Sequence, residues 1–134
     1  MSSTVSIYVA IYNDGGVYKH WGLFIDEPQE ADKMLLHVKG SDGRFRYEPE
    51  ARDARRSASL VELVYLCGVN VTKISAIKSA ASKVIVHNEV RGWNCQDYVL
   101  DLLDALEKEA IVSNQDAGYR NQKILVRGKQ EGLA

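Results

Sequence analysis

The stretch Gly92-Trp93-Asn94-Cys95-Gln96-Asp97-Tyr98-Val99 joins a polar turn to a strongly periodic helical segment. Apolar residues recur behind it at helical spacing, and the charges of residues 101–109 fall mostly on the opposite side. Asn94 is a favourable N-cap residue, so we expect Cys95 in the first turn of this helix. The sequence therefore predicts a helix that begins at a cysteine.

A cysteine at a helix N-terminus has surroundings that suit a nucleophile. Unpaired amide groups and the positive end of the helix dipole stabilise a thiolate there. Thiols in such positions commonly titrate well below the free value of about 8.5. We therefore expect a lowered pKa for the Cys95 thiol. The other cysteine, Cys67, ends an apolar run and is expected to be a buried, unreactive thiol.

The composition is that of one ordinary globular domain over residues 1–134. With 46% apolar residues the chain is long enough to bury a real core. Its 17 basic and 18 acidic residues nearly balance, so no global field directs it toward nucleic acid or an anionic membrane. One arginine cluster is interspersed with acidic residues, which is typical of a solvated loop face rather than an anion site. Its members are Arg44, Arg46, Arg52, Arg55 and Arg56.

Neither a secretory signal nor a membrane span is expected. The apolar run at residues 5–12 is too short for a signal h-region, and no stretch approaches the roughly 20 apolar residues of a transmembrane helix. Two cysteines do not make a secreted disulfide framework. We expect a soluble protein of the cytoplasm.

Strand signals dominate the first half of the chain. Residues 5–12 and 17–25 are β-branched and aromatic, and the turn signal Asn13-Asp14-Gly15-Gly16 between them predicts an antiparallel hairpin. Shorter strands are expected at 34–38 and 44–47, and residues 48–57 look charged and irregular. A strand over 60–67, closed by Gly68, is preferred to a helix because of its β-branched content.

Helical signals dominate the second half. Thr72 is a plausible N-cap for a helix that runs to about Lys83, and the Cys95 helix follows. Residues 124–126 end a last helix or strand, and the tail from Lys129 is expected to be loose. Strands first and helices afterwards predict one α+β domain with an antiparallel sheet.

A cysteine nucleophile needs a base within hydrogen-bond reach and a third group that orients the base. His20 lies in the second expected strand, where alternation places it on the face opposite Trp21. His37 lies in the next strand, and neighbouring strands bring such residues to about 5 Å at the backbone. The third histidine, His87, precedes a turn-like Asn88. Taken alone, a strand histidine or a helix-opening cysteine is more often structural than catalytic.

Three short motifs then point to a known family. Tyr18-Lys19-His20-Trp21-Gly22-Leu23-Phe24-Ile25 resembles the Tyr-x-His-Trp-Ala-x-Tyr-Val strand of the lecithin:retinol acyltransferase-like family. Asn94-Cys95-Gln96-Asp97-Tyr98-Val99 resembles its Asn-Cys-Glu-His-Phe-Val motif, and His37 matches its second histidine. That family is the circularly permuted branch of the NlpC-type, papain-like cysteine enzymes. The resemblance therefore implies a permuted papain-like fold.

The resemblance also implies roles for individual residues. Cys95 would be the nucleophile, His20 the general base and His37 the residue that orients His20. The oxyanion site would include the backbone amide of Cys95 and, as a weaker candidate, the hydroxyl of Tyr18. Further candidates for substrate contacts are Trp21, Trp93 and Asn94; for the two tryptophans, core packing is at least as plausible as a pocket wall.

The chain also departs from the family pattern. Gln96-Asp97 replaces Glu-His, the loop between the two histidine strands is longer, and no apolar C-terminal anchor is present. The substrate is therefore expected to be a small-molecule, acyl or peptide amide, ester or thioester rather than a membrane phospholipid. No phosphate loop or metal-ligand spacing is found, so neither a cofactor nor a metal is expected.

Two alternatives stay open. PPPDE-type isopeptidases also combine a strand histidine with an Asn-Cys helix, but they generally use a Cys–His pair, so His37 would be dispensable. The other alternative is a binding or accessory protein that keeps the fold without turnover, for example in small-molecule biosynthesis.

Overall fold

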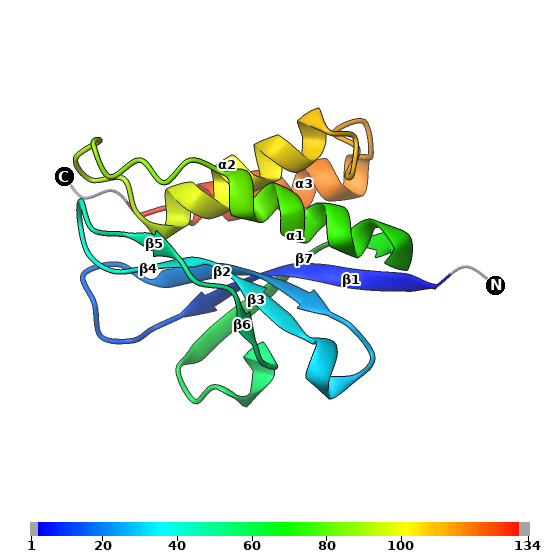
Figure 1. The fold of residues 1–134 in the computed structure, drawn as a ribbon, viewed down its shortest axis with the longest axis horizontal. Coiled ribbons are helices and arrows are strands. Elements are labelled where there is room, and N and C mark those ends of the chain that lie inside the picture. Colours follow the sequence, from blue (N-terminus) through cyan, green and yellow to red (C-terminus); the bar gives the residue numbers. More distant parts are fainter. Residues whose placement is uncertain (1–2, 132–134) are drawn as a thin grey trace.

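In the computed structural model, which describes residues 3–131, strands occupy the first half of the chain and helices the second half (Figure 1). Five antiparallel strands form the main sheet in the order β6-β3-β2-β1-β7. Their bounds are β1 Thr4–Tyr12, β2 His20–Asp26, β3 Met34–Leu36, β6 Glu50–Ala51 and β7 Leu60–Asn70. A separate two-stranded sheet pairs β4 (Val38–Lys39) with β5 (Arg46–Tyr47).

The helices cover one face of this sheet (Figure 1). They are α1 Ile74–Lys83, α2 Cys95–Lys108 and α3 Ala117–Gly128, and short 3₁₀ turns span Glu30–Asp32, Ala54–Arg56 and Val71–Lys73. The main core lies between the helices and the sheet, where Trp21 and Leu23 of β2 meet Leu102 of α2, all of them buried. Burying a large apolar side chain contributes about 1.5–3 kcal/mol, so this contact holds α2 in place. The hydroxyl of Tyr98 donates to Ala81 O at 2.8 Å and ties α2 to α1.

The elements that carry the cysteine and the first histidine form as the sequence predicts. β1 and β2 pair as an antiparallel hairpin, with Tyr12 opposite His20. α2 begins at Cys95, where the Asn94 side chain accepts from the amide of Gln96 at 2.8 Å and Asp97 accepts from the amide of Asn94 at 2.9 Å. The α+β class with an antiparallel sheet is confirmed.

Three strand predictions need correction. The strand expected at 34–38 breaks at His37, because β3 pairs with β2 whereas β4 pairs with β5. Residues 48–57, expected to be irregular, contain β6, which pairs with β3. β7 runs through Gly68 rather than ending there, since the following residues keep their partners on β1. Local pattern does not reveal such long-range pairing.

The C-terminal part also differs from its prediction. Residues 124–126, for which the sequence left helix and strand open, lie in the helix α3. The tail, expected to be loose from Lys129, is bound through Gln130 and Glu131: the Gln130 side chain donates to Asp97 Oδ1 at 2.8 Å, and the Glu131 amide donates to Gln96 Oε1 at 2.8 Å. Within residues 3–131, no helix is both long and apolar enough to cross a bilayer.

Candidate active site

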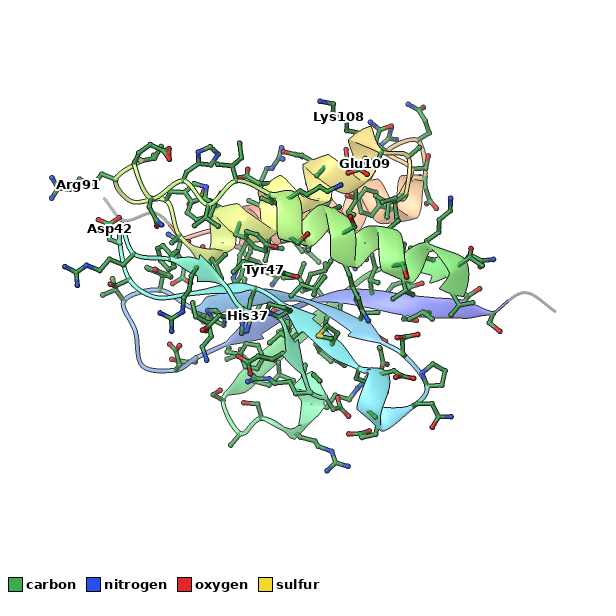
Figure 2. The ribbon with its side chains drawn as sticks, viewed as in Figure 1. His37, Asp42, Tyr47, Arg91, Lys108 and Glu109 are labelled. Atoms are coloured by element: carbon green, nitrogen blue, oxygen red, sulfur yellow. The ribbon has the colours of Figure 1, made fainter. Side chains whose placement is uncertain are left out.

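Two histidine rings meet at the start of β2. His20 opens the strand and His37 follows β3, and Nε2 of His20 lies 2.7 Å from Nδ1 of His37. Gly22 makes room for this approach, because a Cβ there would lie 2.6 Å from Leu35 Cδ1 and 3.4 Å from the Cβ of His37. The predicted juxtaposition of the two imidazoles is therefore present. Figure 2 shows His37 where the main sheet meets β4 and β5.

Glu50 determines which ring nitrogen of each histidine carries the proton. Its Oε1 lies 2.9 Å from Nε2 of His37, and a carboxylate only accepts, so His37 carries its proton on Nε2. Nδ1 of His37 is then a lone pair that accepts from Nε2–H of His20. Because the proton of His20 is on Nε2, its Nδ1 is unprotonated. This Nδ1 makes no hydrogen bond to the described residues. The chain of contacts thus leaves His20 with a free basic nitrogen.

The carboxylate of Glu50 is kept ionised by its neighbours. Lys39 Nζ lies 3.2 Å from Oε1, and Arg52 Nη1 lies 3.2 Å from Oε2. Partial burial acts to raise the pKa of Glu50, but the hydrogen bonds and charges of Lys39 and His37 outweigh it and lower the pKa. Sequence reasoning missed Glu50, which lies in a strand of only two residues inside the segment expected to be irregular.

Both histidines are neutral at neutral pH. Burial, followed by the neighbouring His37, lowers the pKa of His20 to about 4. Burial also lowers the pKa of His37, against the opposing effect of Glu50. Neutral rings are what the proton order described above requires, because a protonated His37 has no lone pair to offer His20.

Cys95 shares a cleft with these histidines. Its side chain is only 2% exposed, yet it lines the same cleft of about 680 Å³ as His20 and His37. Its Sγ lies 3.9 Å from the carbonyl oxygen of Lys19, the residue before His20. The helix that begins at Cys95 therefore places the sulfur against the first residues of β2.

The expected low pKa of the thiol is wrong for this environment. Burial raises the pKa of Cys95 to about 11, although the backbone amides of Trp21, Cys95 and Gln96 act in the opposite direction. Desolvation of the charged form thus outweighs the helix N-terminus. The resting cleft is thus lined by a neutral thiol and a neutral imidazole. Burial likewise raises the pKa of Cys67, which is half-buried, to about 11.

The remaining predicted site residues divide into two pairs. Tyr18 and Trp93 line the cleft, so the prediction that they contact the substrate is compatible with their positions. Trp21 is 1% exposed and lies in the main core, so its expected place in a pocket wall is wrong. Asn94 does not line the cleft: its Oδ1 accepts from the Gln96 amide, and its Nδ2 donates to Gly92 O at 3.1 Å. Asn94 is a helix cap rather than an oxyanion donor.

Comparison with known proteins assigns the chain to a family. A family model described as "Family of unknown function (DUF6540)" matches residues 7–113. The chain belongs to the DUF6540 family. The match runs from within β1 to the loop after α2 and includes His20, His37, Glu50 and Cys95, whereas α3 and Glu131 lie beyond it. No curated protein and no solved structure matches the chain.

In this DUF6540 protein the C-terminal segment, residues 129–131, supports the backbone of the site. Gln96, which is fully buried, donates from Nε2 to Lys19 O at 2.9 Å and to Glu131 Oε1 at 3.2 Å. Glu131 Oε1 also accepts from the Lys19 amide at 2.9 Å. The backbone before His20 is therefore fixed from both α2 and the C-terminal segment. Gln96 stands where the acyltransferase motif has glutamate, and this brace depends on its amide.

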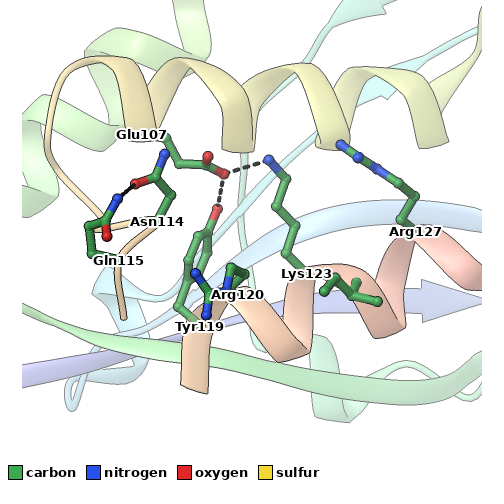
Figure 3. Close-up of a pocket in the computed structure, with 8 residues that line it drawn as sticks. Glu107, Asn114, Gln115, Tyr119, Arg120, Lys123 and Arg127 are labelled. Atoms are coloured by element: carbon green, nitrogen blue, oxygen red, sulfur yellow. Dashed lines mark hydrogen bonds and ion pairs between the residues drawn. The ribbon is translucent and has the colours of Figure 1, made fainter. Parts of the chain in front are cut away.

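A second hollow, of about 360 Å³, lies between α2 and α3 (Figure 3). Several of its polar groups are paired: Lys123 contacts Asp104 at 2.6 Å and Glu107 at 2.5 Å, and the Tyr119 hydroxyl donates to Glu107 at 2.7 Å. These contacts hold α3 on α2. The hollow contains neither a nucleophile nor an unpaired base, so it is no rival to the cleft at Cys95.

No metal centre accompanies the cleft. Among residues 3–131, no three His, Cys, Asp or Glu side chains come together as metal ligands. His87 lies apart from the other two histidines, with Nδ1 at 3.1 Å from Glu89 Oε2 and its ring 5.7 Å from that of Trp93.

Proposed function

We propose that this protein is a cysteine-dependent hydrolase or acyltransferase that acts on amide, ester or thioester carbonyls. The observation that carries the proposal is the contact chain Glu50–His37–His20, which ends on a cleft that Cys95 also lines. The order of a strand histidine, a second histidine and a helix-opening cysteine supports a circularly permuted papain-like fold. The His20–His37 hydrogen bond favours a triad over the Cys–His pair of the PPPDE-type isopeptidases.

In the first half of the reaction, Sγ of Cys95 attacks the carbonyl carbon while its proton moves to Nδ1 of His20. Because the resting pair is neutral, attack and proton transfer occur together. The carbonyl π electrons move onto the oxygen, which accepts a hydrogen bond from the Cys95 amide at the N-terminus of α2, with Tyr18 as a second donor. The oxyanion then re-forms the carbonyl, the bond to the leaving amine, alcohol or thiol breaks, and His20 returns a proton to it.

In the second half, the acyl group is a thioester on Cys95. His20 removes a proton from water or from an alcohol or amine acceptor, which attacks the thioester carbonyl. Collapse of that tetrahedral intermediate breaks the C–S bond, and the sulfur recovers its proton from His20. Throughout, His37 and Glu50 stabilise the positive charge that develops on His20.

Intact-mass spectrometry with an activated acyl ester tests the proposal. We expect one acyl adduct on the wild-type chain and none on Cys95→Ala. Cys67→Ala is the matched control, because Cys67 is also free and has a similarly raised pKa, and this variant should keep the adduct. Equal labelling of Cys95→Ala and wild type would overturn the proposal and favour a binding protein.

A further inference from the structure

The cleft has a second polar corner, at the end of β1, that the reaction described above leaves unused. It is formed by Tyr12, Arg52 and the hydroxyls of Ser57 and Ser59, all of which line the cleft. The guanidinium carbon of Arg52 lies 5.2 Å from the centre of the Tyr12 ring. Of the five guanidinium donors, Nη1 donates to Glu50, and the guanidinium also acts on the nearby Tyr12 hydroxyl. Arg52 therefore keeps donors for a ligand.

Tyr12 carries the clearest sign of a missing partner. Tyr12 is 2% exposed, and its buried hydroxyl lies near the Arg52 guanidinium but makes no hydrogen bond of good geometry within the described part of the chain. An unmet buried hydroxyl costs free energy, so such atoms in native proteins usually have a functional or solvent explanation. Tyr12 lines the cleft beside Arg52, so a ligand bound to the arginine would lie next to this hydroxyl.

The charged residues around this corner favour the binding of a ligand group with one negative charge. Glu50 faces two cations, Lys39 and Arg52, and both histidines are neutral, so these five groups together carry one positive charge. Two acidic residues also line the cleft: the charge of Asp14 acts on His20 and Cys95, and Asp42 lies on the loop after β4. Asp42 accepts from the amide of Gly92, and Figure 2 shows it beside Arg91 and away from His37. An anion is therefore favoured at Arg52 and disfavoured at the turn that carries Asp42.

We infer that Arg52 and Tyr12 bind a free carboxylate of the substrate, so that the preferred acyl donor carries a carboxylate group a few bonds from the reacting carbonyl. A planar carboxylate fits the planar donor fork of arginine and can accept a further hydrogen bond from the Tyr12 hydroxyl. Its single charge matches the single unpaired positive charge better than the nearly double charge of a phosphate monoester does. This assignment revises the expectation that Arg52 belongs to a merely solvated loop face, and it rests on the proposed function.

A pair of esters tests the inference. The substrates are 4-nitrophenyl hydrogen adipate, which carries the carboxylate, and neutral 4-nitrophenyl hexanoate, each corrected for the rate with Cys95→Ala. We expect kcat/KM to favour the adipate ester by about tenfold or more, the effect of one good charge-assisted hydrogen bond. Arg52→Met should abolish this preference, Arg52→Lys should restore part of it, and Tyr12→Phe should reduce it. Inhibition by adipate should exceed inhibition by inorganic phosphate.

Lys39→Met is the matched control, because Lys39 also lines the cleft and contacts Glu50, whereas it is Arg52 that lies over the Tyr12 ring. It should keep the preference. An equal loss in Lys39→Met and Arg52→Met would mean that only net charge matters and would overturn the inference, as would equal rates for the two esters or stronger inhibition by phosphate.

If neither ester acylates Cys95, the proposed function fails by itself. Calorimetric titration of Cys95→Ala with adipate then decides the inference. Binding that Arg52→Met abolishes supports the carboxylate site, and no binding overturns it.

Discussion

Glu50 accepts a hydrogen bond from Nε2 of His37 at 2.9 Å, and this contact fixes the position of every proton between Glu50 and the cleft. The proposed array therefore has four members, Glu50–His37–His20–Cys95, rather than the three that a Cys–His–His motif suggests. Each member has a different role in the proposed reaction, and substitutions should distinguish these roles.

Glu50→Gln should lower kcat by about tenfold while leaving KM for a neutral ester nearly unchanged. Glutamine can still accept from His37, but it lacks the charge that stabilises the imidazolium formed during attack. Steady-state kinetics with 4-nitrophenyl hexanoate measures this. Glu48→Gln is the control, because the Glu48 side chain pairs with the exposed Arg46, and its backbone amide, which donates to His37 O at 3.0 Å, is unchanged by the substitution. Full activity of Glu50→Gln would remove Glu50 from the mechanism.

His37→Ala and His20→Ala should both cost at least about a hundredfold in kcat, the usual scale of a lost general base or its orienting partner. Without His37, the ring of His20 loses its 2.7 Å contact and its proton order. The measurement is again steady-state acyl transfer, compared with His87→Ala, whose ring lies outside the array. A His37→Ala variant with near wild-type activity would instead indicate the dyad of the PPPDE-type isopeptidases.

Alkylation of Cys95 should accelerate steeply with pH. Because burial raises the pKa of this thiol to about 11, the thiolate fraction at pH 7 is smaller than for a free thiol and grows throughout the alkaline range. Iodoacetamide labelling of Cys67→Ala, followed by intact mass from pH 6 to 10.5, isolates the Cys95 rate. A plateau below about pH 8 would show a preformed thiolate and contradict the neutral resting pair.

Folding stability should fall between about pH 6.5 and pH 4. Burial lowers the pKa of His20 to about 4 and also lowers that of His37, so the unfolded chain binds more protons than the folded chain in this window. Stability from these neutral rings is thus fully present above the unfolded pKa and lost as the pH falls. Urea unfolding at pH 7, 6 and 5 measures the slope. His20→Gln should flatten it, and a slope equal to that of wild type would assign the effect to other groups.

The sequence predicts those parts of the site that depend on local pattern. Asn94 and the apolar period behind it place Cys95 at a helix start, and strand alternation separates His20 from the buried Trp21. Glu50 escapes prediction because β6 is defined only by its pairing with β3. The pKa of Cys95 escapes it as well, because desolvation depends on how closely β2 packs on α2.

Gln96→Glu, which restores the residue of the acyltransferase motif, should destabilise this chain and lower its activity. The amide of Gln96 donates to Lys19 O and to Glu131 Oε1, and a carboxylate at this fully buried position would face two acceptors and a like charge. Losing such contacts costs about 1–3 kcal/mol, measurable by urea unfolding. Combining Gln96→Glu with Glu131→Gln should recover part of the loss, because glutamine at position 131 supplies a donor and removes the repulsion. Equal stability of Gln96→Glu and wild type would mean that the C-terminal segment does not brace Lys19.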